Sequence, residues 1–297
     1  LSVSSNTQVA SATGSSATNT LVSNVANLTV GPNDLAAGAA SVTTTGATST
    51  AALGLASVQI NKEVAVTASN LSSTPFAGVQ LSSAAGSQLT VNGNLASASS
   101  TGNSVANTVQ VIATNIATTT GDATAIAALS NLQSNDGAGT DSTVVGASAA
   151  TSIPLVGVQV NGAVTGSSAL SVADNSVSAK ALGNTGSNQL AVTGTNLTST
   201  APATNIVGTS STVATGAVTS EFALTNRQTD AVAARTADAN NVVLGINTTG
   251  NLAASTLAVT NNLVSAEARN NQINNVASLT GFATLTTSAG LLNEQTS

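Results

Sequence analysis

The sequence lacks the side chains on which most enzyme chemistry depends. It has no His, Cys, Met, Trp or Tyr, only 3 Phe, and only 5% charged residues. Without an imidazole or a thiol, a chain cannot build a Ser-His-Asp triad, a typical zinc centre or a dithiol redox site. The 11 acidic residues are isolated, and no two have the spacing expected of a glycosidase pair. These absences predict a structural protein that is not an enzyme.

The sequence is also short of bulky apolar side chains. Its hydrophobic fraction of 41% consists mainly of Ala, Val and Leu. Each of these side chains buries little apolar area, and burial stabilises a fold by only about 25 cal/mol per Å². Such residues suit a thin core in which backbones approach closely. Disorder is disfavoured because the mean hydropathy is positive and the net charge is only −6. We therefore expect an all-β fold, either an elongated β-solenoid or a stacked β-sandwich.

Positive charge and long apolar runs are scarce as well. The 5 basic residues are scattered, so they form no footprint for nucleic acid. No apolar run approaches the roughly 18 residues of a membrane helix, and 3 Phe cannot supply aromatic girdles, so we expect no membrane insertion. The sequence begins at Leu1 without a signal peptide, which favours a processed, exported product. Zero Cys is consistent with the bacterial cell surface or extracellular space.

An internal repeat is the strongest positive signal in the sequence. Copies of one pattern begin near residues 1, 89, 170 and 257, so successive starts are 88, 81 and 87 residues apart. Residues 1–29 and 170–198 align without a gap, sharing a Leu-Ser-Val start and an Asn-Leu-Thr end. No composition shift marks a linker. The repeat predicts a single elongated domain over residues 1–297.

Asparagines keep their register in all four copies. Equivalent Asn side chains on stacked strands can hydrogen-bond to one another in a ladder, and Asn also tolerates tight corners. We therefore interpret them as structural repeat residues. The first set is Asn6, Asn94, Asn175 and Asn262, and the second is Asn19, Asn107, Asn188 and Asn275.

Local patterns favour strands. Pairs such as Leu89/Val91 alternate with polar residues at period 2, and Val177, Ala179 and Ala181 place small groups on one face, which would let two sheets approach closely. Two segments, 122–134 and 229–240, have helix as an alternative. A shorter similarity, between AVTASNLSST at 65–74 and AVTGTNLTST at 191–200, predicts a coil of about 40 residues within the longer period.

One segment carries a weak calcium signal. NDGAGTD at 135–141 resembles half of a calcium-binding β-roll repeat, in which Asp136 and Asp141 would supply oxygen ligands. True β-rolls repeat this motif in tandem, so a plain Asp-Gly turn is the alternative. We expect no other cofactor. The Thr runs at 43–45 and 118–120 are contiguous, which does not fit the T-x-T rows of an ice-binding face.

The L-x-V-x-x-N, V-x-A-x-A-x-G-N and N-L-T-S patterns resemble the β-strand-repeat proteins of stalked alphaproteobacteria, in particular the holdfast anchors that tie an adhesive polysaccharide to the cell pole. They are similar, less closely, to secreted functional-amyloid subunits, from which the chain departs in having no C-terminal Cys pair and few Gln. The resemblance implies an exported fibre or anchor subunit. Its partners would be further copies of itself, a surface polysaccharide or an outer-membrane anchor.

Together these features predict a structural subunit of an extracellular filament or surface anchor. Almost uncharged β-edges invite strand-to-strand association, because natural edge strands are usually protected by charges. We expect the contacts at the two ends of the repeat series, with a frayed tail as the alternative at the C-terminal end. A monomeric carbohydrate- or ice-binding adhesin passenger is the alternative function. The residues predicted for assembly are Leu1, Val3, Leu279, Phe282 and Leu285.

Overall fold

The computed structural model describes residues 1–30, 41–44, 47–62, 66, 68–69, 77–118, 125–136, 144–146, 156–198, 211–213, 216–231, 236–239 and 242–296. Every regular element in these ranges is a β-strand. The prediction of an all-β fold is therefore confirmed.

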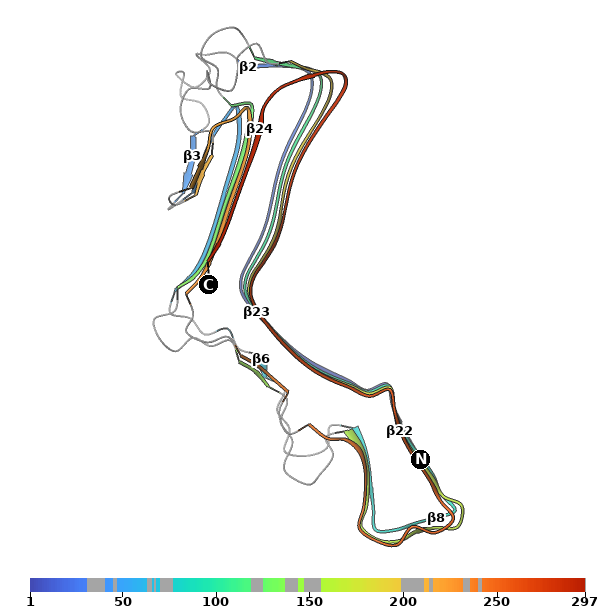
Figure 1. The fold of residues 1–297 in the computed structure, drawn as a ribbon. Helices are drawn as coiled ribbons and strands as arrows, with labels where there is room; N and C mark the ends of the chain where they lie inside the picture. The colour runs from blue at the N-terminus through green and yellow to red at the C-terminus, as the bar shows by residue number, and fades with distance from the viewer. Residues whose placement is uncertain are drawn as a thin grey trace.

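The strands stack in parallel, one from each successive turn of the chain, as coils of a solenoid (Figure 1). Three sheets have four strands each. The first joins β1 (Ser2–Ser4), β9 (Gln88–Asn92), β15 (Ala169–Ala173) and β22 (Thr256–Thr260). The second joins β2 (Thr7–Val30), β10 (Leu95–Thr118), β16 (Ser176–Thr198) and β23 (Leu263–Thr286). The third joins β5 (Leu53–Lys62), β11 (Ala127–Asp136), β19 (Phe222–Asp230) and β24 (Ala289–Thr296).

Smaller parallel sheets complete the return side of the first three coils, and none of their strands comes from the described residues of the fourth coil. One sheet joins β6 (Ala68–Ser69), β12 (Val144–Gly146) and β20 (Thr236–Asp238), and a second joins β7 (Ala77–Leu81), β13 (Val156–Val160) and β21 (Leu244–Thr248). At the tip, β8 (Ala84–Ala85) pairs with β14 (Val164–Thr165). Among the described residues, the strands of the fourth coil are β22, β23 and β24.

The strand register matches the sequence repeat. Asn107 lies opposite Asn19 on one side and Asn188 on the other, and Asn188 lies opposite Asn275. One coil therefore takes the whole repeat of 81 to 88 residues. The expected 40-residue coil is wrong, because a turn of this solenoid has two long sides and closes only after both.

The coil is a long, narrow, bent loop whose two sides enclose a thin core (Figure 1). Near the β8 tip the core is mainly Val and Leu, such as Val91, Val158 and Val172. In the middle Ala98, Ala179 and Ala181 pack against Ala237 and Ala239. This confirms that small residues let the two sides approach closely. At the other end lies a larger apolar cluster that includes Ile116, Leu129, Leu190, Leu197, Phe222 and Leu224.

Two segments have helix as an alternative. The first, 122–134, forms strand β11 from Ala127 onward. Its apolar residues do not alternate because both faces of the strand are buried, a pattern that a short sequence shares with a buried helix. The outer face is covered by an antiparallel sheet of β3 (Ser41–Thr44), β4 (Ala47–Thr50), β17 (Ser211–Val213) and β18 (Gly216–Val218). In the second segment, 229–240, the described residues include the end of β19 and the strand β20, so helix is wrong for those residues. Ala233 and Ala234, on which that alternative is centred, lie outside the described residues.

The same corner geometry recurs in all four coils between the first sheet and the second. The residue before each asparagine of the first Asn set has a positive φ: 57° at Ser5, 65° at Gly93, 54° at Asp174 and 53° at Asn261. Gly, Asn and Asp tolerate this left-handed conformation best. The corner therefore turns the chain at the same point in every coil and aims the following Asn along the stack.

Candidate functional site

The first Asn set forms a continuous ladder at this corner. The Nδ2 atoms of Asn6, Asn94 and Asn175 each donate to the Oδ1 atom of the next coil's Asn, at 2.8, 2.8 and 2.9 Å. The same Oδ1 atoms also accept from the backbone N–H of the preceding coil's Asn at 3.0 Å. Each carboxamide therefore fixes both a corner and the stacking of one coil on the next.

The second Asn set forms a ladder inside the core. Asn19, Asn107 and Asn188 each donate through Nδ2 to Oδ1 of the next member at 2.8 Å. Their second donors cross the core: Asn107 reaches Asn131 at 3.0 Å, and Asn188 reaches Asn226 at 3.1 Å. Both sets predicted from the sequence are thus brought together as ladders, here with a second row facing them.

The facing row is a ladder that sequence reasoning missed. Asn131 donates to Asn226, and Asn226 to Asn293, both at 2.8 Å. Two residues further along the same strands lies a glutamine ladder, in which each Nε2 donates to the Oε1 of the preceding coil at 2.7 to 2.9 Å. Its members are Gln59, Gln133, Gln228 and Gln295.

A fourth asparagine ladder was also missed. Asn103 donates to Asn184, and Asn184 to Asn271, both at 2.8 Å. In the first coil this position is Ser15, which donates instead to Asn61 across the core at 2.9 Å. Oδ1 of Asn103 consequently has no partner among the described residues, although it is buried.

A sequence signal for the missed rows exists, but its spacing is irregular. The pattern polar-x-Gln-x-polar recurs as SVQIN at 57–61, NLQSN at 131–135, NRQTD at 226–230 and NEQTS at 293–297. These segments are 74, 95 and 67 residues apart, because spacers of different length precede them in each coil. A search that requires a constant period does not detect them.

The ladders are as buried as the apolar core. Asn107, Asn131, Asn188 and Gln133 are at most 1% exposed. Buried amides without partners would each cost about 1–3 kcal/mol, whereas amides aligned with identical neighbours satisfy one another. The arrangement can hold coils in register, and it contains no nucleophile, acid or base in a reactive geometry.

The edges of the outer coils are open. Leu170 and Val172 of the third coil are 1% and 0% exposed, but their register partners in the fourth coil, Leu257 and Val259, are 40% and 49% exposed. Further along, Leu197 is 0% exposed and its partner Leu285 is 50% exposed. These positions are core positions that lack one neighbouring coil.

The residues predicted for assembly occupy different environments. Leu1 is 70% exposed, while Val3 and Leu279 point inward and are partly buried against the core. Leu285 is half exposed at the fourth coil's edge. The C-terminal segment does not form a frayed tail, because β23 pairs with β16, and β24 with β19, along their lengths.

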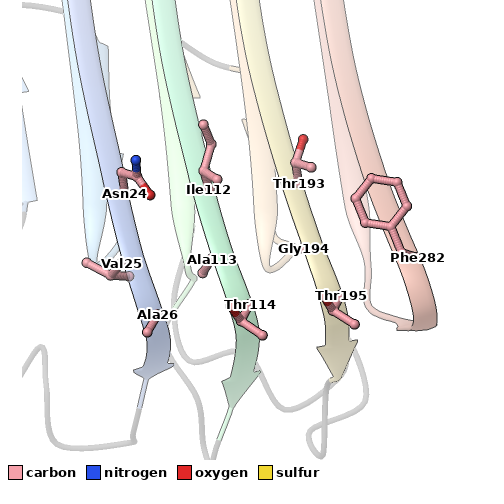
Figure 2. A pocket seen from close by; sticks show the side chains of 10 residues that line it. All are labelled: Asn24, Val25, Ala26, Ile112, Ala113, Thr114, Thr193, Gly194, Thr195 and Phe282. Carbon is pink, nitrogen blue, oxygen red and sulfur yellow. The ribbon is translucent and has the colours of Figure 1, made fainter.

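Phe282 belongs to a surface groove rather than to the core. A register shift inserts one extra residue into β23 after Gly281, and Phe282 projects outward there with 75% exposure. Figure 2 shows its ring at the end of a row that crosses all four coils through Asn24, Ile112 and Thr193. The groove has a volume of about 350 Å³ and is completed by Val25, Ala26, Ala113, Thr114, Gly194 and Thr195.

Strands β23 and β24 of the fourth coil carry charged side chains, which β1 and β2 of the first coil lack. Glu267 lies between Arg269 and Lys180, 3.7 Å from the latter, and Glu294 lies 3.7 Å from Arg227. Residues 1–30 contain no charged side chain. The expectation of nearly uncharged edges therefore holds for β1 and β2 and is wrong for β23 and β24 of the fourth coil.

Glu221 is a buried carboxylate with a structural environment. It is 1% exposed, and its Oε2 accepts from the Thr287 hydroxyl at 2.6 Å and from the Ser288 N–H at 2.8 Å. These bonds tie the turn between β23 and β24 to the third coil.

Metal and membrane features are as follows. Asp141 of the calcium motif lies outside the described residues, and Asp136 is described only as the end of β11. Within the described ranges, no group of three or more acidic side chains could hold a metal ion. No helix long and apolar enough to cross a membrane occurs in that part of the chain.

Comparison with protein-family models, with curated proteins and with solved structures yields no match to this chain.

Proposed function

We propose that this chain is a structural subunit of a self-assembling extracellular filament or cell-surface anchor of bacteria. The observation that carries the proposal is the open edge of the fourth coil. There, Leu257, Val259 and Leu285 occupy core positions but remain 40 to 50% exposed. Repeat proteins that remain monomeric need polar capping repeats at such ends.

The amide ladders support the same proposal. Stacked Asn and Gln rows join identical strands, and they add to the stability of cross-β assemblies. In this chain they continue to both outer coils, at Asn6 and Asn19 in one direction and at Asn262 and Asn275 in the other. A structural role requires only this stacking and no reactive group.

Electron microscopy of the purified chain over a range of concentrations tests this function. We expect unbranched filaments above a threshold concentration, because association of open coil edges depends on mass action. Monodisperse monomers at every concentration would contradict the proposal.

A carbohydrate-binding adhesin is the second candidate, and Phe282 is the observation that favours it. An exposed aromatic ring beside Thr193 and Thr195 offers an apolar face and hydroxyl groups to a sugar ring (Figure 2). If this function is correct, the monomer binds polysaccharide and Phe282→Ala removes binding. Thr20→Ala, an exposed change on β2 outside the groove, serves as the control. Equal binding by both variants would argue against the groove as a sugar site.

A further inference from the structure

We infer that a second copy of this chain stacks its first coil on the fourth coil of the first copy, in the register that joins the coils within one molecule, and that Asn270 weakens this junction. The inference rests on the proposed function and specifies the contact. It places β1, β2 and β5 of the second copy over β22, β23 and β24 of the first. The four-stranded sheets would thereby run on through the junction.

The donors and acceptors at the two edges are complementary. In the described part of the chain, Oδ1 of Asn6 and Oδ1 of Asn19 accept no hydrogen bond, although their counterparts in later coils do. Asn275 uses one Nδ2 hydrogen on Asn293, and Asn262 uses one on Val172. The second hydrogen of each points along the ladder direction, which leads from the first coil to the fourth.

The glutamine ladder has the opposite polarity and matches equally well. Each Gln donates to the preceding coil, so Oε1 of Gln295 is the acceptor left at the fourth coil, and Gln59 carries the donor at the first. A head-to-tail stack satisfies both ladders. Pairing two first coils would set Asn acceptors against one another, so the ladders favour the head-to-tail arrangement. Heterologous contacts of this kind generate filaments when the rotation between copies does not close a ring.

Apolar burial favours the same contact. Val177 of the third coil is 0% exposed beneath its register partner Val264, which is itself 45% exposed. As the intramolecular register continues, Val259 would lie beneath Val3 of the second copy, and Val264 would be covered by the side chain of Gln8. Among the described residues, the sheet that ends in β21 contains no strand of the fourth coil, so we place the junction on the other side of the loop.

Asn270 interrupts this fit at one point. At Gly14 and Gly102 an added Cβ would lie 2.6 Å from the next coil's carbonyl oxygen, and at Gly183 it would meet the carbonyl of Asn270. The fourth coil is the one in which this position carries a side chain. A coil stacked on Asn270 must therefore shift locally, which raises the concentration needed for assembly.

Thiol cross-linking tests the register of the junction. Because the native sequence contains no Cys, only the introduced thiols can react. Val22 and Ser278 occupy equivalent outward positions on β2 and β23, since both align with Gln110 and Ala191 of the middle coils. The full chains Val22→Cys and Ser278→Cys are mixed under assembly conditions and treated with dibromobimane. We expect dimers in the mixture and none in either variant alone.

The control replaces Val22→Cys by Thr18→Cys, four residues and about 13 Å away along the same face of β2. It should give no dimer with Ser278→Cys. Dimers of Val22→Cys alone would show that first coils pair with each other and would overturn the inference. Filaments by electron microscopy without cross-linking in the mixture would overturn the junction and leave the proposed function standing. Absence of any assembly would overturn both.

Two matched pairs of variants test the interface by another route. Val264→Lys should abolish assembly, whereas Val243→Lys, at 44% exposure on the β21 side, should leave it unchanged. Asn270→Gly should lower the threshold concentration by about tenfold, equivalent to about 1.4 kcal/mol per junction. Asn274→Gly, on the outward face of the same strand, should leave the threshold unchanged. Circular dichroism melts of the unassembled chains confirm folding. Equal thresholds for wild type and Asn270→Gly would contradict the role of Asn270.

Discussion

The two middle coils and the two outer coils use the same design but differ in burial. In the third coil, Leu170, Val172 and Leu197 are at most 1% exposed, while their counterparts in the fourth are 40 to 50% exposed. The middle asparagines have ladder neighbours on both sides, and the outer ones have a neighbour on one side. The comparison shows that contacts between neighbouring coils supply much of the stability, because a coil gains most of its burial from the coils on either side.

The largest expected effect separates a middle-coil leucine from its outer-coil counterpart. Leu197→Ala should destabilise the folded chain by about 2–5 kcal/mol, because it leaves a cavity in a fully buried cluster. Leu285→Ala, at the register-equivalent position, should cost below about 1 kcal/mol. Denaturant unfolding below the assembly threshold measures both. Equal losses would show that the fourth coil is as well packed as the third.

Next in size is the buried asparagine ladder. Asn188→Ala removes the acceptor for Asn107 and the donor to Asn226 in a buried core, so we expect a loss of about 2–3 kcal/mol. Asn275→Ala should cost about half as much, because this residue is partly exposed. The same unfolding experiment compares them. A larger loss of unfolding free energy at Asn275 than at Asn188 would contradict the view that burial determines how much each ladder residue stabilises the fold.

The smallest effect concerns the ladder on the outer surface. Asn115 donates to Asn27 at 2.7 Å and accepts from Asn196 at 2.8 Å, and both bonds are exposed to water. Water can replace these partners, so Asn115→Ala should cost about 0.5–1 kcal/mol. Thermal melts would resolve this from the Asn188 variant. A loss as large as that at Asn188 would mean that the row is protected from water.

The sequence allowed the strand class, the repeat starts and two of the asparagine ladders to be predicted, because Asn6 and Asn19 recur at nearly constant spacing. It did not reveal the glutamine ladder, since the spacers before Gln59, Gln133 and Gln228 differ in length. It also left β11 ambiguous, because a strand buried on both faces loses its alternation. The outward position of Phe282 depends on a single inserted residue, whose effect on register the sequence alone does not show.

Hydrogen exchange of the chain before and after assembly tests the central claim most directly, namely that the outer coils are incomplete copies of the middle ones. Unassembled, β10 and β16 should exchange slowly, while the amides of β2 and β23 that face away from the stack exchange fast. In filaments, those amides of β2 and β23 should become as protected as β10 and β16, with β21 unchanged. Unaltered exchange in β2 and β23 despite filament formation would contradict the claim.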